Sequence, residues 1–287
     1  MLANVLGGST YYLIKEALGA WPPALLILAR TLLAVPLFLA VMPRGWAGRA
    51  TRADWLRMLA IGLVGLAAPH LVGTYGLVET DSLNGAILIG MEPVSITVLS
   101  WFLLGERLVG RQVLAIVGAL VGALLVVSGG DLARAASLSG SVRGNVLLAF
   151  HGVLWAVYTV AAKPTLVRVP PRALAAVTTL VSLLAVGPAG AMELDELDPS
   201  RAFRPWPLAI IVILAVAISF GATVAWNAAL KRIKAVQMAA LIFLQPLTGA
   251  VLGAVRGERL GLAAFVGAAL ILAGVFGTRS GGGEPQG

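Results

Sequence analysis

Ten runs of apolar residues, each about as long as a membrane-spanning helix, dominate the sequence. A helix that crosses a bilayer needs about 20 predominantly apolar residues, and in lipid only helices and closed barrels satisfy every backbone hydrogen bond. The runs lie near residues 1–18, 22–42, 55–77, 82–104, 109–129, 142–162, 170–190, 207–229, 234–255 and 260–278. The sequence therefore predicts an all-α integral membrane protein with ten transmembrane helices.

The composition supports a lipid-facing surface. Hydrophobic residues make up 59% of the 287 residues and charged residues only 12%, whereas soluble proteins carry about 25% charged residues. The net charge of +8 does not indicate a nucleic-acid partner, because the basic residues lie in short loops without interleaved aromatics. We expect them to set topology and to contact anionic lipid headgroups. Cysteine is absent, and we expect neither a metal site nor a cofactor.

The basic residues also predict an orientation. If the ten helices alternate in direction, Arg30 falls inside a span and 13 of the other Lys and Arg residues lie in loops on the side of the N-terminus. Seven lie on the opposite side, namely Lys15, Arg134, Arg143, Arg201, Arg204, Arg256 and Arg259. Cytoplasmic loops carry the excess of Lys and Arg, which predicts cytoplasmic termini in the inner membrane. We expect the acidic run from Glu193 to Asp198 in an external loop, and a disordered tail at 279–287.

Two parts of the chain repeat one another. Glu92-Pro93 aligns with Gln245-Pro246, Gly105-Glu106-Arg107-Leu108 aligns with Gly257-Glu258-Arg259-Leu260, and Lys15 and Pro23 match Lys163 and Pro171 at one constant offset. We therefore predict two copies of a five-helix unit, at residues 1–129 and 142–278. Because five is odd, the second copy must enter the membrane inverted. Inverted repeats of this kind are typical of secondary transporters, whose two halves exchange inward-open and outward-open states.

These repeated marks resemble the drug/metabolite transporter superfamily and its EamA-like family. Trp155-Ala156-Val157-Tyr158 and the position of Arg30 after Pro22-Pro23 add to the resemblance, which covers nearly the whole chain. It implies a 5+5 inverted fold, function as a monomer, and export of amino acids or related metabolites by alternating access. Within the superfamily the chain is more weakly similar to YddG-type amino-acid exporters. Export of drugs, nucleobases or lipid-linked metabolites stays open.

Other classes of function fit less well. An intramembrane enzyme needs a nucleophile–base pair or metal ligands at depth, and no such sequence motif is present, so we predict no catalytic residue. A channel predicts a selectivity element, usually with oligomeric symmetry, whereas duplication within one chain favours a carrier.

Two charged residues fall inside predicted spans. Glu92 lies near the middle of its span beside Pro93, and a carboxylate at that depth is a functional candidate. We expect it to couple transport to protons, aided by backbone acceptors that a mid-helix proline would free. The alternatives are an ion pair with Arg30 or a neutral, hydrogen-bonded side chain. Arg30 could bind a substrate carboxylate or act as a structural clamp.

Further candidates for a substrate cavity are aromatic and polar residues at depth. Aromatic faces suit organic solutes and ammonium groups, although some of these side chains could instead belong to the interfacial belt. His70 and His151 are isolated in the sequence and could line the cavity or simply pack. The candidates are Trp101, Trp155, Trp226, Tyr75, Tyr158, His70, His151 and Asn227.

The repeated motif itself has a structural interpretation. Glu106 and Glu258 each follow a glycine at a helix–helix turn, where a carboxylate can accept N–H groups at the start of the next helix. Pro93 and Pro246 belong to the same motif. Glycines spaced four apart, such as Gly118 and Gly122, predict close helix packing.

Overall fold

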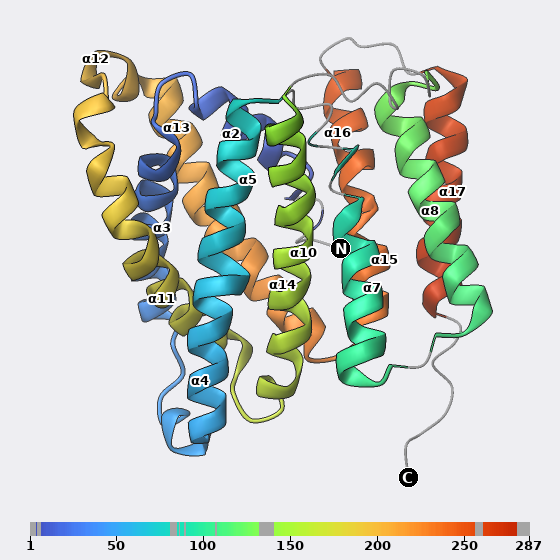
Figure 1. Ribbon diagram of the computed structural model, residues 1–287, viewed down its shortest axis with the longest axis horizontal. Coiled ribbons are helices and arrows are strands. Elements are labelled where there is room, and N and C mark those ends of the chain that lie inside the picture. The colour runs from blue at the N-terminus through green and yellow to red at the C-terminus, as the bar shows by residue number, and fades with distance from the viewer. Residues whose placement is uncertain are drawn as a thin grey trace.

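Figure 1 shows the computed structural model of the chain, which describes residues 4, 7–80, 85, 87–88, 90–106, 108–131, 141–255 and 261–279. The described part is a bundle of helices that run up and down between two ends, and it contains no strand. The all-α prediction is confirmed for these residues. Glu258 and residues 280–287 of the predicted tail lie outside them.

Six helical segments are long and apolar enough to cross a membrane. They are α3 (Pro23–Ala40), α4–η2–α5 (Arg52–Ala60, Ile61–Ala67, Ala68–Val78), α8 (Gly110–Ser128), α10 (Val142–Thr165), α11 (Pro171–Met192) and α13–η4–α14 (Pro205–Ile213, Leu214–Ala222, Thr223–Leu230). Shorter apolar helices are α7 (Met91–Leu104), α15 (Ala235–Ile242), α16 (Leu244–Val255) and α17 (Leu262–Arg279). With α2 (Thr10–Ala17), every predicted run contains a helix.

Prolines start several helices as predicted. Pro23, Pro171 and Pro205 are the first residues of α3, α11 and α13, where the missing N–H would have no intrahelical partner. The start of α3 is also capped by Glu193, whose Oε2 accepts from the N–H groups of Ala24 at 2.7 Å and Leu25 at 3.0 Å. Glu193, which the sequence places in an external loop, directly follows α11 and is buried as this cap.

The two prolines expected in the middle of helices, Pro93 and Pro246, lie in first turns instead. Helix α7 begins at Met91, which puts Pro93 in its first turn, and α15 ends at Ile242 so that Pro246 lies in the first turn of α16. The prediction of a central proline kink is therefore wrong. The chain instead interrupts the helix just before each proline, with turn-type bonds from Gly90 N to Ile87 O and from Phe243 N to Ala240 O, at 3.1 and 3.3 Å.

Helices α8 and α17 pack closely through glycine, at the edge of the bundle in Figure 1. A Cβ added to Gly122 would lie 2.6 Å from the carbonyl oxygen of Gly267, so only glycine lets these backbones approach. A Cβ on Gly118 would meet nothing within 4 Å. The predicted close packing is therefore found at Gly122 but not at Gly118.

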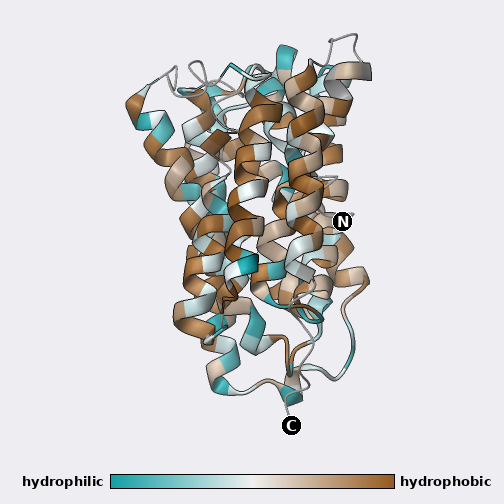
Figure 2. Cartoon of the chain, turned by 90° about the vertical axis from the view of Figure 1, so that its right-hand side faces the viewer, coloured by the Kyte–Doolittle hydropathy of each residue, from teal (hydrophilic) through white to brown (hydrophobic). Residues whose placement is uncertain are grey.

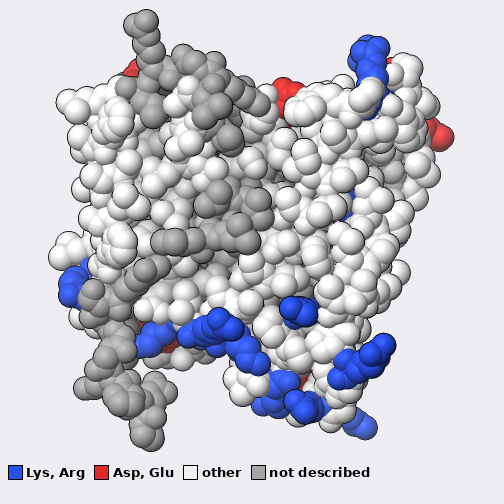
Figure 3. Space-filling view, turned by 180° about the vertical axis from the view of Figure 1, so that it is seen from behind, with Lys and Arg blue, Asp and Glu red and all other residues white. Residues whose placement is uncertain are grey.

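The outer face suits a bilayer. Figure 2 shows hydrophobic residues along the length of the helices, and large apolar side chains such as Leu32 and Phe102 are exposed. In Figure 3, which shows the molecule from behind, most of the visible Lys and Arg lie at the lower end, where the loops before α4 and between α10 and α11 lie. This apolar belt above a basic rim matches the surface of a membrane protein.

Candidate functional site

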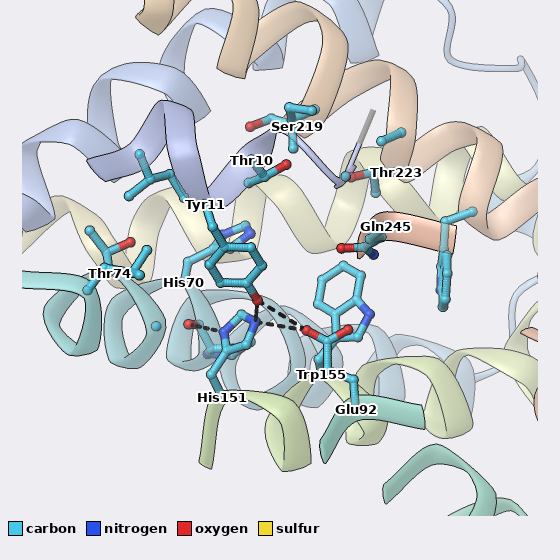
Figure 4. A pocket seen from close by; sticks show the side chains of 18 of the residues that line it. Thr10, Tyr11, His70, Thr74, Glu92, His151, Trp155, Ser219, Thr223 and Gln245 are labelled. Carbon is cyan, nitrogen blue, oxygen red and sulfur yellow. Dashed lines mark hydrogen bonds and ion pairs between the residues drawn. The ribbon is translucent and has the colours of Figure 1, made fainter. Parts of the chain in front are cut away.

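A cavity of about 120 Å³ lies in the middle of the bundle, between helices from both ends of the sequence (Figure 4). Helices α2, α3, α5 and α7 line it from the first half of the chain, and α10, η4, α14 and α16 from the second. The lining residues are Asn4, Gly7, Thr10, Tyr11, Ile14, Arg30, Pro69, His70, Gly73, Thr74, Leu77, Glu92, His151, Trp155, Ile218, Ser219, Ala222, Thr223, Trp226 and Gln245.

Helical periodicity explains two walls of the cavity. The α5 residues that line it stand at −1, 0, 3, 4 and 7 positions from His70, and those of η4 and α14 repeat this spacing from Ser219. Residues at this spacing share one helix face. Each wall is preceded by or includes a π-helical segment, η2 or η4, a distortion that is common at functional sites.

A polar triad closes one side of the cavity. The Tyr11 hydroxyl lies 3.3 Å from Glu92 Oε1 and 3.1 Å from His151 Nε2, and these two atoms are 3.2 Å apart. Figure 4 shows the three side chains pointing toward one another. The other ring nitrogen of His151, Nδ1, donates to the carbonyl oxygen of Pro69 at 2.8 Å. A Cβ on Gly73 would lie 2.6 Å from Nδ1, so glycine makes the room for this ring.

The triad needs one exchangeable proton. Because Nδ1 carries a proton for Pro69, a neutral His151 offers Nε2 as a bare acceptor. The single Tyr11 proton can serve only one of its two neighbours, so contact between Nε2 and a Glu92 carboxylate is attractive only if one of them is protonated. An attractive contact between these two side chains therefore requires one proton between Nε2 and the carboxylate. His151, isolated in the sequence, thus lines the cavity with two side-chain partners.

On the cavity wall, several donors lack a partner. Arg30 is 2% exposed, its Nε has no hydrogen-bond partner, and it forms no ion pair with a described carboxylate. Unpartnered atoms on the same lining are His70 Nδ1, Thr10 Oγ1, Ser219 Oγ and Trp226 Nε1. The predicted alternative of an Arg30–Glu92 ion pair is wrong, because Glu92 pairs with His151.

Trp155 and Trp226 form an aromatic wall, with ring centroids 6.0 Å apart. Tyr158 stacks behind Trp155 at 5.1 Å and an interplanar angle of 7°, and its hydroxyl accepts a hydrogen bond from Asn227 Nδ2 at 2.7 Å. Both Trp side chains line the cavity, whereas Tyr158 and Asn227 are fully buried behind it. These two support the wall and do not line it.

Two other candidates lie away from the cavity. Trp101 is 56% exposed, because it follows Glu92 by nine residues and so points to the opposite side of α7. Tyr75 lies on the far face of α5 from His70 and donates to Glu193. Periodicity relative to Glu92 and His70 could have excluded both residues.

Glu106 has a structural role. Its two carboxylate oxygens accept from Ala235 N at 2.9 Å and from Val236 N at 3.1 Å, which caps the start of α15. The sequence predicted a cap for the next helix in the chain, α8, and that partner is wrong. The cap links the first half of the chain to the second.

Sequence reasoning missed Tyr11, Thr10, Ser219 and Thr223 as lining residues. The available signal was polar side chains inside apolar runs, but hydroxyls in membrane helices often bond to their own backbone. Among the described residues, no group of three or more His, Asp or Glu could hold a metal ion.

Known proteins resemble this chain over nearly its full length. The EamA-like transporter family matches residues 1–128 and 142–280. The uncharacterized transporter YyaM of Bacillus subtilis (strain 168) is 24% identical over 95% of this chain and 90% of its own. A probable terminal-alkyne amino-acid exporter of Streptantibioticus cattleyicolor is 30% identical over 96% of this chain and 90% of its own.

Solved structures share the fold, among them one crystal structure. It has a TM-score of 0.77 at 24% identity, covering 96% of this chain and 93% of that chain. The spanning helices and the family match indicate a multi-pass membrane protein of a transporter family. The chain belongs to the EamA-like transporter family.

Proposed function

We propose that this protein exports small metabolites, foremost amino acids, by alternating access through the central cavity. The observation that carries the proposal is the cavity itself, because both halves of the chain line it and it combines unpartnered donors with an aromatic wall. A site between two halves is where a carrier can open to either side in turn.

The architecture we propose is a 5+5 inverted repeat of ten transmembrane helices with cytoplasmic termini. Corresponding contacts in the two halves support it. Lys15 Nζ donates to the carbonyl oxygens of Leu77 and Thr80, at 2.6 and 2.8 Å, and Lys163 Nζ donates to those of Leu230 and Ile233. In each half the lysine thus caps the end of the third helix, and the fourth is interrupted before its proline.

The size of the cavity favours one small metabolite over a drug or a lipid-linked product. A cavity of about 150 Å³ holds a benzene molecule, and this one measures about 120 Å³. The amino-acid class is supported by the name of the Streptantibioticus cattleyicolor relative, a probable terminal-alkyne amino-acid exporter.

A proton role for the Glu92–His151 pair completes the proposal. A pair that holds one exchangeable proton next to the substrate cavity can release it in one state and regain it in another. This role extends the sequence hypothesis for Glu92 alone by giving the carboxylate a partner at 3.2 Å.

Counterflow in proteoliposomes tests the proposal. Vesicles with purified protein are loaded with one unlabelled amino acid and exposed to the same labelled amino acid, with and without a pH gradient. We expect label to accumulate for at least one of the 20 amino acids, whereas protein-free vesicles accumulate none. If no amino acid shows counterflow, the proposed substrate class is wrong.

A further inference from the structure

We propose that Arg30 and His70 bind the carboxylate group of the transported metabolite. This inference rests on the proposed function and deepens it, since it names the group on the substrate and the residues that hold it. The starting point is the position of Arg30, seven residues after the first residue of α3, about 10 Å from the helix end, with a side chain that lines the cavity.

The charge on Arg30 is not compensated within the described part of the protein. No described carboxylate pairs with it, and its Nε has no hydrogen-bond partner. Glu92, the acidic residue of the cavity lining, contacts His151 at 3.2 Å. Burial of an unpaired charge is strongly unfavourable, so a residue that served only packing would be neutral. Thr178 stands at the matching position of the other half and bonds to the carbonyl oxygen of Leu174 at 2.9 Å.

The groups around Arg30 require an acceptor. His70 lines the same cavity as Arg30, and its Nδ1 is unpartnered. Trp226 Nε1 is also unpartnered, and guanidinium and indole nitrogens only donate. A ligand that satisfies this lining must therefore present oxygens and negative charge.

A carboxylate fits these requirements better than a phosphate. Its two oxygens match the planar fork of a guanidinium in a bidentate pair. It carries one negative charge, which balances the single charge of Arg30. A phosphate dianion would bring two negative charges to a single guanidinium, and its tetrahedral oxygens match the planar fork less well.

Thermal unfolding of the purified protein in detergent tests the inference. The probes are the 20 amino acids, the amides of the same amino acids, and inorganic phosphate. We expect at least one amino acid to raise the Tm, and the matching amide, which lacks the charge, to have no effect. For that amino acid, Arg30→Gln should weaken binding by about 10- to 100-fold, as expected for loss of a charged hydrogen-bond partner, and Arg30→Lys should retain part of it.

Two further variants guard against a general loss of structure. Ser182 is buried and has an unpartnered hydroxyl, but it does not line the cavity, so Ser182→Ala should bind like the wild type. His70→Asn keeps the charge of Arg30 and should weaken binding several-fold. If Arg30→Gln does not fold, the comparison of His70→Asn with Ser182→Ala and of acid with amide decides the matter.

The outcomes separate this inference from the proposed function. Equal stabilisation by an amino acid and its amide, or a response to phosphate alone, overturns the carboxylate site but leaves an exporter possible. If Arg30→Gln and His70→Asn leave counterflow unchanged, the carboxylate site is likewise overturned and the proposed export function still stands. If no amino acid shifts the Tm and none shows counterflow, both the inference and the proposed substrate class are wrong.

Discussion

The roles of single residues in this chain depend on contacts with partners that lie far away in the sequence. Glu92 and His151 are 59 positions apart, yet their side chains meet at 3.2 Å, and Tyr11 contacts both. The sequence could place Glu92 and His151 within apolar runs because hydropathy is a local property. It could not pair them, since the rotation of each helix about its axis depends on tertiary packing.

Glu92→Gln tests the proton role of the pair. Glutamine has nearly the shape of glutamate, and its amide can donate to His151 Nε2, so we expect folding and counterflow to persist. Accumulation driven by a pH gradient should fall to the level seen without a gradient, because the shared proton is gone. Glu79→Gln is the control. The Glu79 carboxylate forms an ion pair of 3.1 Å with Arg143, and Glu79 does not line the cavity. Unchanged pH-driven accumulation in Glu92→Gln would leave Glu92 as a structural hydrogen-bonding group.

Trp155→Ala and Trp226→Ala test the aromatic wall. A Trp face is worth about 0.5–2 kcal/mol to a bound cation, so either change should reduce apparent substrate affinity about 2- to 30-fold while protein still folds. Trp101→Ala removes an exposed Trp and should transport like the wild type. Normal transport by the folded fraction of both wall variants would make these two residues packing groups only.

The elements of the fold join through a few close approaches and caps. Glu106 caps α15 and Glu193 caps α3, and in both cases the carboxylate and the helix it caps belong to different halves of the chain. Glycine serves where backbones meet, as between α8 and α17.

Gly122→Ala and Gly118→Ala form a matched pair on α8. The new methyl group at position 122 would lie 2.6 Å from the Gly267 carbonyl oxygen, and overpacking of this kind costs about 1–3 kcal/mol. At position 118 it would meet nothing within 4 Å, and Ala favours a helix over Gly by about 0.5–1 kcal/mol. Thermal unfolding should therefore show a lower Tm for Gly122→Ala and an equal or higher Tm for Gly118→Ala. Equal losses for both would show that α8 and α17 do not pack as described.

The sequence predicted elements better than their junctions. Helical class, proline starts and the EamA-like family follow from hydropathy, backbone chemistry and a repeated motif, and all three are confirmed. The interruptions before Pro93 and Pro246 were predicted as kinks, because hydropathy does not register a broken helix inside an apolar run. The partner of Glu106 was wrong because helices adjacent in the chain need not share a cap.

The molecule as a whole consists of two halves of the chain around one cavity. Each half supplies one wall with the same spacing of lining residues, from His70 and from Ser219. The Arg, Glu and His side chains of the lining are unequally divided between the halves, with Arg30, His70 and Glu92 in the first and His151 in the second. Movement of the halves against one another would therefore change the surroundings of the substrate and of the shared proton together.

Cysteine labelling tests the proposed orientation, because the chain has no cysteine of its own. Asp195→Cys and Gly48→Cys introduce exposed thiols on η3 (Leu194–Glu196) and η1 (Ala47–Arg49), and a side chain at position 48 meets nothing within 4 Å. In intact cells, an impermeant maleimide should label the Asp195→Cys variant, and it should label the Gly48→Cys variant only after the membrane is opened. Labelling of both variants from outside would contradict the proposed topology.

Accessibility of the cavity from each side of the membrane is the direct test of alternating access. Ser219→Cys places one thiol on the cavity lining, and an impermeant methanethiosulfonate reagent is applied either outside or inside oriented vesicles. Alternating access predicts that this thiol reacts from both sides, and that an imposed solute gradient raises the rate on one side while lowering it on the other. Reaction from a single side under every condition would contradict the claim that the cavity opens in turn to each face of the membrane.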